Sequence, residues 1–107
     1  MKLPPAIQAY FDADTDIDGP APTTVFATNT IVKDDGKTHV GHEAIAEWWR
    51  AAKAQYQATS EPREISGAGE RFTVLAEVRG KFTGSPITLS FIFTLKDNAI
   101  VTLEIGA

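Results

Sequence analysis

The second half of the chain contains the feature that most constrains its fold, a series of strand-like runs separated by short turns. The runs span residues 64–66, 71–82, 87–96 and 99–105, and glycine, proline, aspartate and asparagine stand between them. Runs bounded by such residues are typical of β-strands, and short turns join antiparallel neighbours. The sequence therefore predicts an antiparallel meander.

Apolar side chains occur on both faces of this predicted sheet. One face of the run 71–82 is entirely apolar: Phe72, Val74, Ala76 and Val78. Successive side chains of a strand point to opposite faces, so the opposite face should be polar. Leu75 interrupts this polar face in the run 71–82, and Ile92 interrupts the corresponding face of the run 87–96. Helices can cover one face of such a sheet, and a partner subunit can cover the other.

Two amphipathic stretches in the first half of the chain predict helices. After Pro4 and Pro5, which a first helical turn tolerates, Ile7, Tyr10 and Phe11 share one helical face. A longer helix is predicted from residue 41 to about residue 57. Its apolar stripe consists of Ile45, Trp48, Trp49, Ala52 and Tyr56, and the pattern places Lys53 outside it. Helices followed by a meander predict an α+β fold, with the helices on one face of a curved sheet.

Acidic residues stand at two informative positions. Asp14 continues the face of Ile7 and Tyr10, where a carboxylate is unexpected, so it either ends the helix in a turn or faces a pocket. A short strand over residues 29–33 ends at Asp34, in the turn sequence Asp-Asp-Gly-Lys, and the chain returns over residues 38–40.

Composition excludes several classes of protein. The 107 residues predict a single domain, 1–107. Ten basic and 14 acidic residues give a net charge of −4, which argues against a nucleic-acid partner. The absence of cysteine excludes disulfides and thiolate metal sites. The longest uncharged run, residues 83–95, is too short to span a membrane, so we expect a cytoplasmic protein with no membrane partner.

Four motifs, taken together, resemble one known superfamily. They are Ile7-Gln8-Ala9-Tyr10-Phe11, Phe26-Ala27, Ile31-Val32-Lys33-Asp34 and Gly41-His42-Glu43-Ala44-Ile45-Ala46-Glu47-Trp48. Their order is similar to that of the nuclear transport factor 2-like superfamily. More narrowly it resembles the SnoaL-like branch, which includes polyketide cyclases and ketosteroid isomerase. The resemblance implies a cone-shaped fold of helices on a strongly bent antiparallel sheet, with a ligand pocket inside the cone. It also implies a homodimer formed through the outer face of the sheet.

The resemblance further implies a proton-transfer site. Asp34 takes the position of the catalytic base, and Tyr10 that of the tyrosine that donates a hydrogen bond to the substrate oxygen. Where the isomerase has a second carboxylate, this chain has the apolar Phe91. The residues expected to line a pocket for a small apolar ligand are Asp14, Phe26, His39, Trp48, Trp49, Tyr56 and Phe91. No metal and no organic cofactor is expected.

The residues alone leave simpler interpretations open. Asp34 could be part of a solvated turn, Tyr10 could be a core residue, and His39 and His42 could lie on the surface. The sequence is therefore compatible with two functions. One is an isomerase or cyclase in which Asp34 transfers a proton on a small apolar carbonyl compound. The other is a non-catalytic module of the same fold that binds a small ligand or a protein.

Overall fold

The computed structural model describes all 107 residues as two helices packed on one six-stranded sheet. The helices are α1 (Pro5–Asp14) and α2 (Gly41–Tyr56), and a 3₁₀ turn, η1 (Thr23–Val25), lies between them. The strands are β1 (Phe26–Asp34), β2 (Lys37–Val40), β3 (Thr59–Ala68), β4 (Arg71–Arg79), β5 (Ile87–Lys96) and β6 (Ala99–Gly106). Neither helix is long and apolar enough to cross a membrane.

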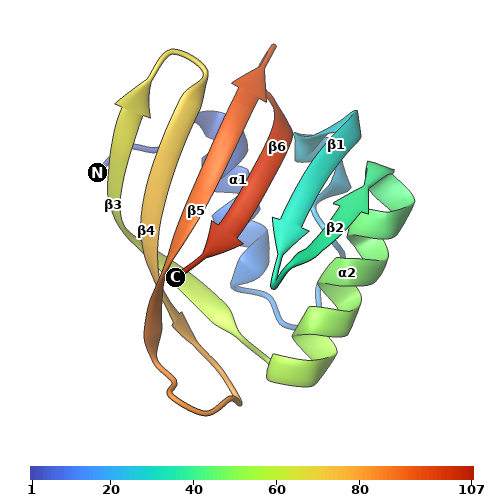
Figure 1. Cartoon of the computed structure of the whole chain (residues 1–107), viewed down its shortest axis with the longest axis vertical. Helices are drawn as coiled ribbons and strands as arrows, with labels where there is room; N and C mark the ends of the chain where they lie inside the picture. The colour runs from blue at the N-terminus through green and yellow to red at the C-terminus, as the bar shows by residue number, and fades with distance from the viewer.

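The sheet has the order β2-β1-β6-β5-β4-β3, which confirms the predicted α+β architecture. The four strands of the meander, β3 to β6, pair successively, and each is antiparallel to the next. The pair β1–β6 is parallel, unlike the expected purely antiparallel sheet. A long connection containing α2 separates β1 from the meander, and parallel neighbours require such a connection. In Figure 1, α1 lies behind the sheet, and α2 packs against the end formed by β1 and β2.

Three irregularities in strand pairing accompany the curvature of the sheet. The register shifts between Phe26 and Ile31 in β1, between Pro62 and Glu64 in β3, and between Thr94 and Leu95 in β5. An extra residue in one strand bends that strand and increases its twist. Both helices pack on the same face of this curved sheet, which we call its concave face, because Tyr10 of α1 contacts both Trp49 of α2 and Phe93 of β5.

Tyr10 lies at the centre of the core, surrounded by five other aromatic rings. Its ring centroid lies 5.2–6.2 Å from those of Phe11, Phe26, Trp49, Phe91 and Phe93, most of them edge to face. Edge-to-face packing is the favoured arrangement of aromatic rings and adds to the stability gained by burying them. The rings from α1, α2, β1 and β5 thus meet in one cluster that joins both helices to the sheet.

The buried face of α2 differs from the predicted stripe. Its buried residues are Ile45, Trp49 and Lys53, whereas Trp48 and Ala52 are only partly buried. Placing Lys53 outside the stripe was therefore wrong. A lysine can be buried when its ammonium group is fully paired, and the partner responsible lies at the end of α1.

Candidate functional site

Asp34 lies at the end of β1 and is held in place by a side chain from α2. Trp48 Nε1 donates a hydrogen bond of 3.0 Å to Asp34 Oδ2. This hydrogen bond engages one of the two carboxylate oxygens. The ring of His39 lies 5.9 Å from that of Trp48, at an interplanar angle of 30°. We call Asp34, His39 and Trp48 the hairpin site, because two of the three stand on the β1–β2 hairpin.

Strand register places the hairpin site on the concave face of the sheet. Val32 is fully buried in β1 and pairs with His39 in β2. Asp34 stands two residues beyond Val32, so its side chain points to the same face. Asp35 follows in the turn with φ = 53° and is exposed. Of the two adjacent aspartates, only Asp34 is therefore partly buried against α2.

Tyr10 interacts electrostatically with the hairpin site. Its side chain is buried, and burial raises the pKa of its hydroxyl well above the ordinary tyrosine value. The negative charges of Asp14 and Asp34 raise that pKa further, because they oppose a phenolate. Tyr10 is therefore a neutral hydrogen-bond donor within the electrostatic reach of Asp34.

This raised pKa predicts that the fold loses stability in alkaline solution. Above about pH 10 the unfolded chain releases the Tyr10 proton whereas the folded chain retains it, so stability falls as the pH rises. We expect the free energy of unfolding to fall more steeply with pH in Tyr56→Phe, which retains Tyr10, than in Tyr10→Phe. Urea unfolding between pH 9 and pH 11, followed by circular dichroism, measures the difference. Equal slopes, with phenolate absorbance appearing reversibly in folded Tyr56→Phe near pH 10, would contradict the prediction.

The other residues expected to line a pocket lie in three different places. Phe26, Phe91 and Trp49 pack against Tyr10 in the aromatic cluster. Tyr56 packs instead on Phe82, with ring centroids 6.2 Å apart. The structure thus brings Asp34, His39 and Trp48 together. Tyr10 and its aromatic neighbours form a second group, and Tyr56 and Asp14 lie apart from both groups.

Asp14 forms an ion pair that the sequence did not reveal. Lys53 Nζ lies 2.6 Å from Asp14 Oδ1, and both residues are more than 90% buried. The ammonium group also donates to the backbone oxygens of Asp14 and Ala58, while Asp14 Oδ2 accepts the backbone N–H of Ser60. The pair therefore fastens the end of α1 to α2 and to the start of β3. A carboxylate on an otherwise apolar helical face was the only signal of it.

His42 also has a structural contact instead of the expected surface position. Its Nε2 lies 2.8 Å from the backbone oxygen of Phe26, and the side chain is partly buried. This contact joins the first turn of α2 to the start of β1. The interpretation of His42 as a surface residue was therefore wrong.

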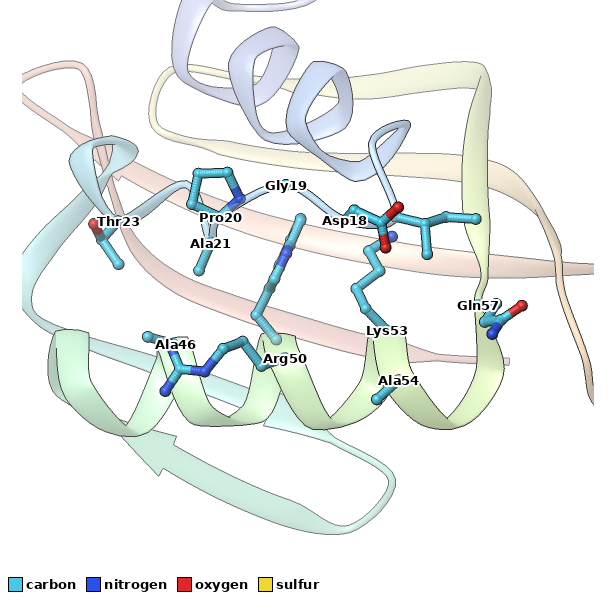
Figure 2. Close-up of a pocket in the computed structure, with 12 residues that line it drawn as sticks. Asp18, Gly19, Pro20, Ala21, Thr23, Ala46, Arg50, Lys53, Ala54 and Gln57 are labelled. Atoms are coloured by element: carbon cyan, nitrogen blue, oxygen red, sulfur yellow. The ribbon is translucent and has the colours of Figure 1, made fainter.

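A pocket of about 670 Å³ lies between α2 and the segment that follows α1. Figure 2 shows Pro20, Ala21 and Thr23 of that segment facing Ala46, with Lys53 reaching from α2 toward Asp18. We call this the loop–α2 pocket, lined by residues 17–21, 23, 46, 49, 50, 53, 54 and 57. None of the three hairpin-site residues lines it.

Trp49, in the wall of the loop–α2 pocket, has an unpaired polar atom. Its Nε1 is the one buried side-chain nitrogen or oxygen in the protein without a hydrogen-bond partner. Leaving a buried donor unpaired costs about 1–3 kcal/mol. An atom of this kind therefore requires an explanation in a native structure.

The fold places the protein in the class of α+β proteins whose helices pack on one face of a curved sheet. The sequence profile of the SnoaL-like domain family matches residues 5–103. The chain therefore belongs to that family, as its motifs predicted. No curated protein sequence is significantly similar to it.

Solved structures support the same assignment. A protein from Sinorhizobium meliloti, named as a candidate polyketide cyclase, is 44% identical, with 96% of this chain and 94% of that chain covered and a TM-score of 0.89. A protein with a ketosteroid isomerase-like fold from Catenulispora acidiphila, solved with trimethylamine, is 21% identical over 99% and 87% of the chains, with a TM-score of 0.86. SalBIII, an epoxide hydrolase/cyclase-like enzyme of pyran ring formation in salinomycin, is 22% identical over 95% and 87%, with a TM-score of 0.76.

Proposed function

We propose that this protein is an isomerase or cyclase that transfers a proton on a small apolar carbonyl compound, with Asp34 as the base. The observation that carries the proposal is the Asp34 carboxylate, fixed by the Trp48 indole on the concave face of the sheet. A base must be held within reach of the proton that it abstracts, and the hydrogen bond to Oδ2 restricts its orientation. The 44% identity to a candidate polyketide cyclase supports the same class of reaction.

The proposed reaction follows from the properties of Asp34 and Tyr10. Asp34 removes a proton from the carbon next to the carbonyl group, and the electron pair moves onto the carbonyl oxygen as an enolate. Tyr10, neutral and buried, donates a hydrogen bond to that oxygen. In an isomerisation the carboxylic acid returns the proton to a different carbon. In a cyclisation the enolate carbon attacks a second carbonyl group of the same molecule, and the new alkoxide takes the proton.

A hydrogen–deuterium exchange assay tests the proton transfer without knowledge of the natural substrate. The protein is incubated in D₂O with a panel of small cyclic ketones and 1,3-diketones, and loss of the α-proton signals is followed by NMR. We expect at least one compound to exchange faster than in buffer, with a rate that saturates with its concentration. Exchange at the buffer rate for every compound that binds would contradict catalysis and support the alternative function.

That alternative is a module that binds a small apolar ligand or a protein without chemistry. It is favoured by the apolar Phe91, which by the family resemblance takes the position of the isomerase's second carboxylate. The relative from Catenulispora acidiphila was solved with a small molecule, trimethylamine. A binding module would retain its ligand unchanged, and Asp34→Asn would leave the affinity intact.

We further propose that the outer face of the sheet forms a homodimer. Leu75 and Ile92 point to this face, and neither is fully buried within one chain. Apolar residues on an uncovered sheet face are typical of an interface between copies. Sedimentation equilibrium should give twice the mass of 11.6 kDa for the native protein and for the control Ala51→Lys, but 11.6 kDa for Ile92→Lys. A monomeric native protein would contradict the proposal.

A further inference from the structure

His39 is the one titratable residue of the hairpin site that the proposed proton transfer leaves without a role. Its partner across the strands is Val32, which is fully buried on the concave face, so the His39 side chain points to that face. Asp34 stands two residues further along β1 and pairs with Lys37. Diagonal neighbours of this kind lie about 7–8 Å apart, a distance that one small molecule can span.

A single indole ring positions both His39 and Asp34. Trp48 donates its N–H to Asp34 Oδ2. The imidazole ring of His39 lies against the same indole, with ring centroids 5.9 Å apart and an angle of 30° between the planes. This packing engages the face of the imidazole and leaves its edge, which carries both nitrogens, for other partners.

The two histidines of the chain differ in how their nitrogens are used. His42 Nε2 contacts the backbone oxygen of Phe26, whereas neither nitrogen of His39 has a hydrogen-bond partner within the protein. Neither is enclosed, because Trp49 Nε1 is the one buried polar side-chain atom without a partner. A histidine changes its charge between about pH 5 and pH 8, so it gives and takes protons near neutrality. His39 is therefore an unused acid–base group beside the proposed base.

The order of the strands places Asp34 between His39 and Tyr10. Strand β2 forms the edge of the sheet and β1 is its neighbour, whereas Tyr10 packs on Phe91 and Phe93 of β5, two strands further along (Figure 1). A substrate above Asp34 would therefore meet one hydrogen-bonding group on each side. Such a site suits a molecule with two carbonyl oxygens.

We propose that His39 is a second catalytic residue of the hairpin site and protonates the alkoxide formed in a cyclisation. This role rests on the proposed function of Asp34, and it selects cyclisation of a dicarbonyl compound over isomerisation. Asp34 takes a proton from carbon, and the enolate carbon forms a bond to the second carbonyl carbon. The electron pair of that C=O bond becomes an alkoxide, to which the imidazolium gives its N–H proton. Water then returns the proton of the Asp34 carboxylic acid to the neutral imidazole, so no other reactant is needed.

The test uses heptane-2,6-dione as the probe, since its intramolecular aldol reaction gives 3-hydroxy-3-methylcyclohexanone and its α-protons exchange in D₂O. One NMR time course therefore measures both the exchange, which requires only Asp34, and the ring closure, which requires His39 as well. His39→Phe keeps an aromatic ring against Trp48 but removes the acid. It should lower the rate of ring closure by about 10²-fold or more and leave exchange at the native rate.

Two controls separate proton donation from charge and from shape. Lys37 is the other proton donor of β2 that the register places on this face, and it is exposed, so Lys37→Met should close the ring at the native rate. In His39→Ala, added imidazole should restore ring closure. Pyrazole, a ring of the same shape but a much weaker base, should not restore it.

The outcomes distinguish the role of His39 from that of Asp34. Catalysed exchange together with native ring closure in His39→Phe would overturn the role of His39 and leave Asp34 as the base. Catalysed exchange without ring closure in the native protein would do the same. Equal losses in Lys37→Met and His39→Phe, or equal restoration by imidazole and pyrazole, would also overturn it. Exchange of the probe at the buffer rate in the native protein would remove the proposed function for this substrate class, and the role of His39 with it.

Discussion

Replacing Lys53 with methionine is expected to lower the free energy of unfolding by about 3–5 kcal/mol, because it leaves a buried carboxylate without its partner. Asp14 is 7% exposed and keeps only one other hydrogen bond, from the Ser60 backbone N–H. Methionine preserves most of the length and apolar surface of lysine. The loss should therefore report the missing ammonium group and not a missing volume. Urea unfolding at neutral pH, followed by circular dichroism, measures it.

Two further variants isolate the ion pair. Arg50→Met makes the same type of change at an exposed position of α2 and should alter stability by no more than about 0.5 kcal/mol. The double variant Asp14→Asn with Lys53→Met should be less destabilised than the sum of its single variants, since it buries no unpaired charge. Strict additivity, or a Lys53→Met variant as stable as Arg50→Met, would show that the pair does not hold the helices together.

Replacing Asp34 with asparagine is expected to reduce catalysed hydrogen–deuterium exchange by about 10²–10⁴-fold, the contribution of a positioned general base. Asparagine keeps an oxygen that can accept the Trp48 hydrogen bond, so the local structure should be retained. It cannot take up a proton at neutral pH. The rates are compared at saturating ketone, after circular dichroism has shown that both proteins are folded.

Asp35→Asn is the matched control for this experiment. Asp35 is exposed, and its φ of 53° is a conformation that asparagine also tolerates. Its variant should exchange the ketone at the native rate. Equal losses in both variants would indicate a general effect of charge on the hairpin. Native activity in Asp34→Asn would remove Asp34 from the mechanism.

Most of the regular structure followed from local patterns in the sequence. The predicted run 87–96 matches β5, and the predicted long helix matches α2 to within one residue. Both have clear periodicity, which depends only on nearby residues. By contrast, β3 extends from Thr59 to Ala68, although only residues 64–66 were predicted. Pro62 and several charged residues conceal it, because an edge strand tolerates proline and polar side chains.

Motifs and hydrophobic periodicity were sufficient to predict the family, the α+β architecture and the position of Asp34 at the end of a strand. They did not predict that Trp48 donates to Asp34 while its neighbour Trp49 packs against Tyr10. Only the tertiary structure revealed the pairing of Lys53 with Asp14, 39 residues away. The physical reason is the same in both cases. A polar side chain is buried or exposed according to the partners that it meets in space, and hydrophobic periodicity contains no record of them.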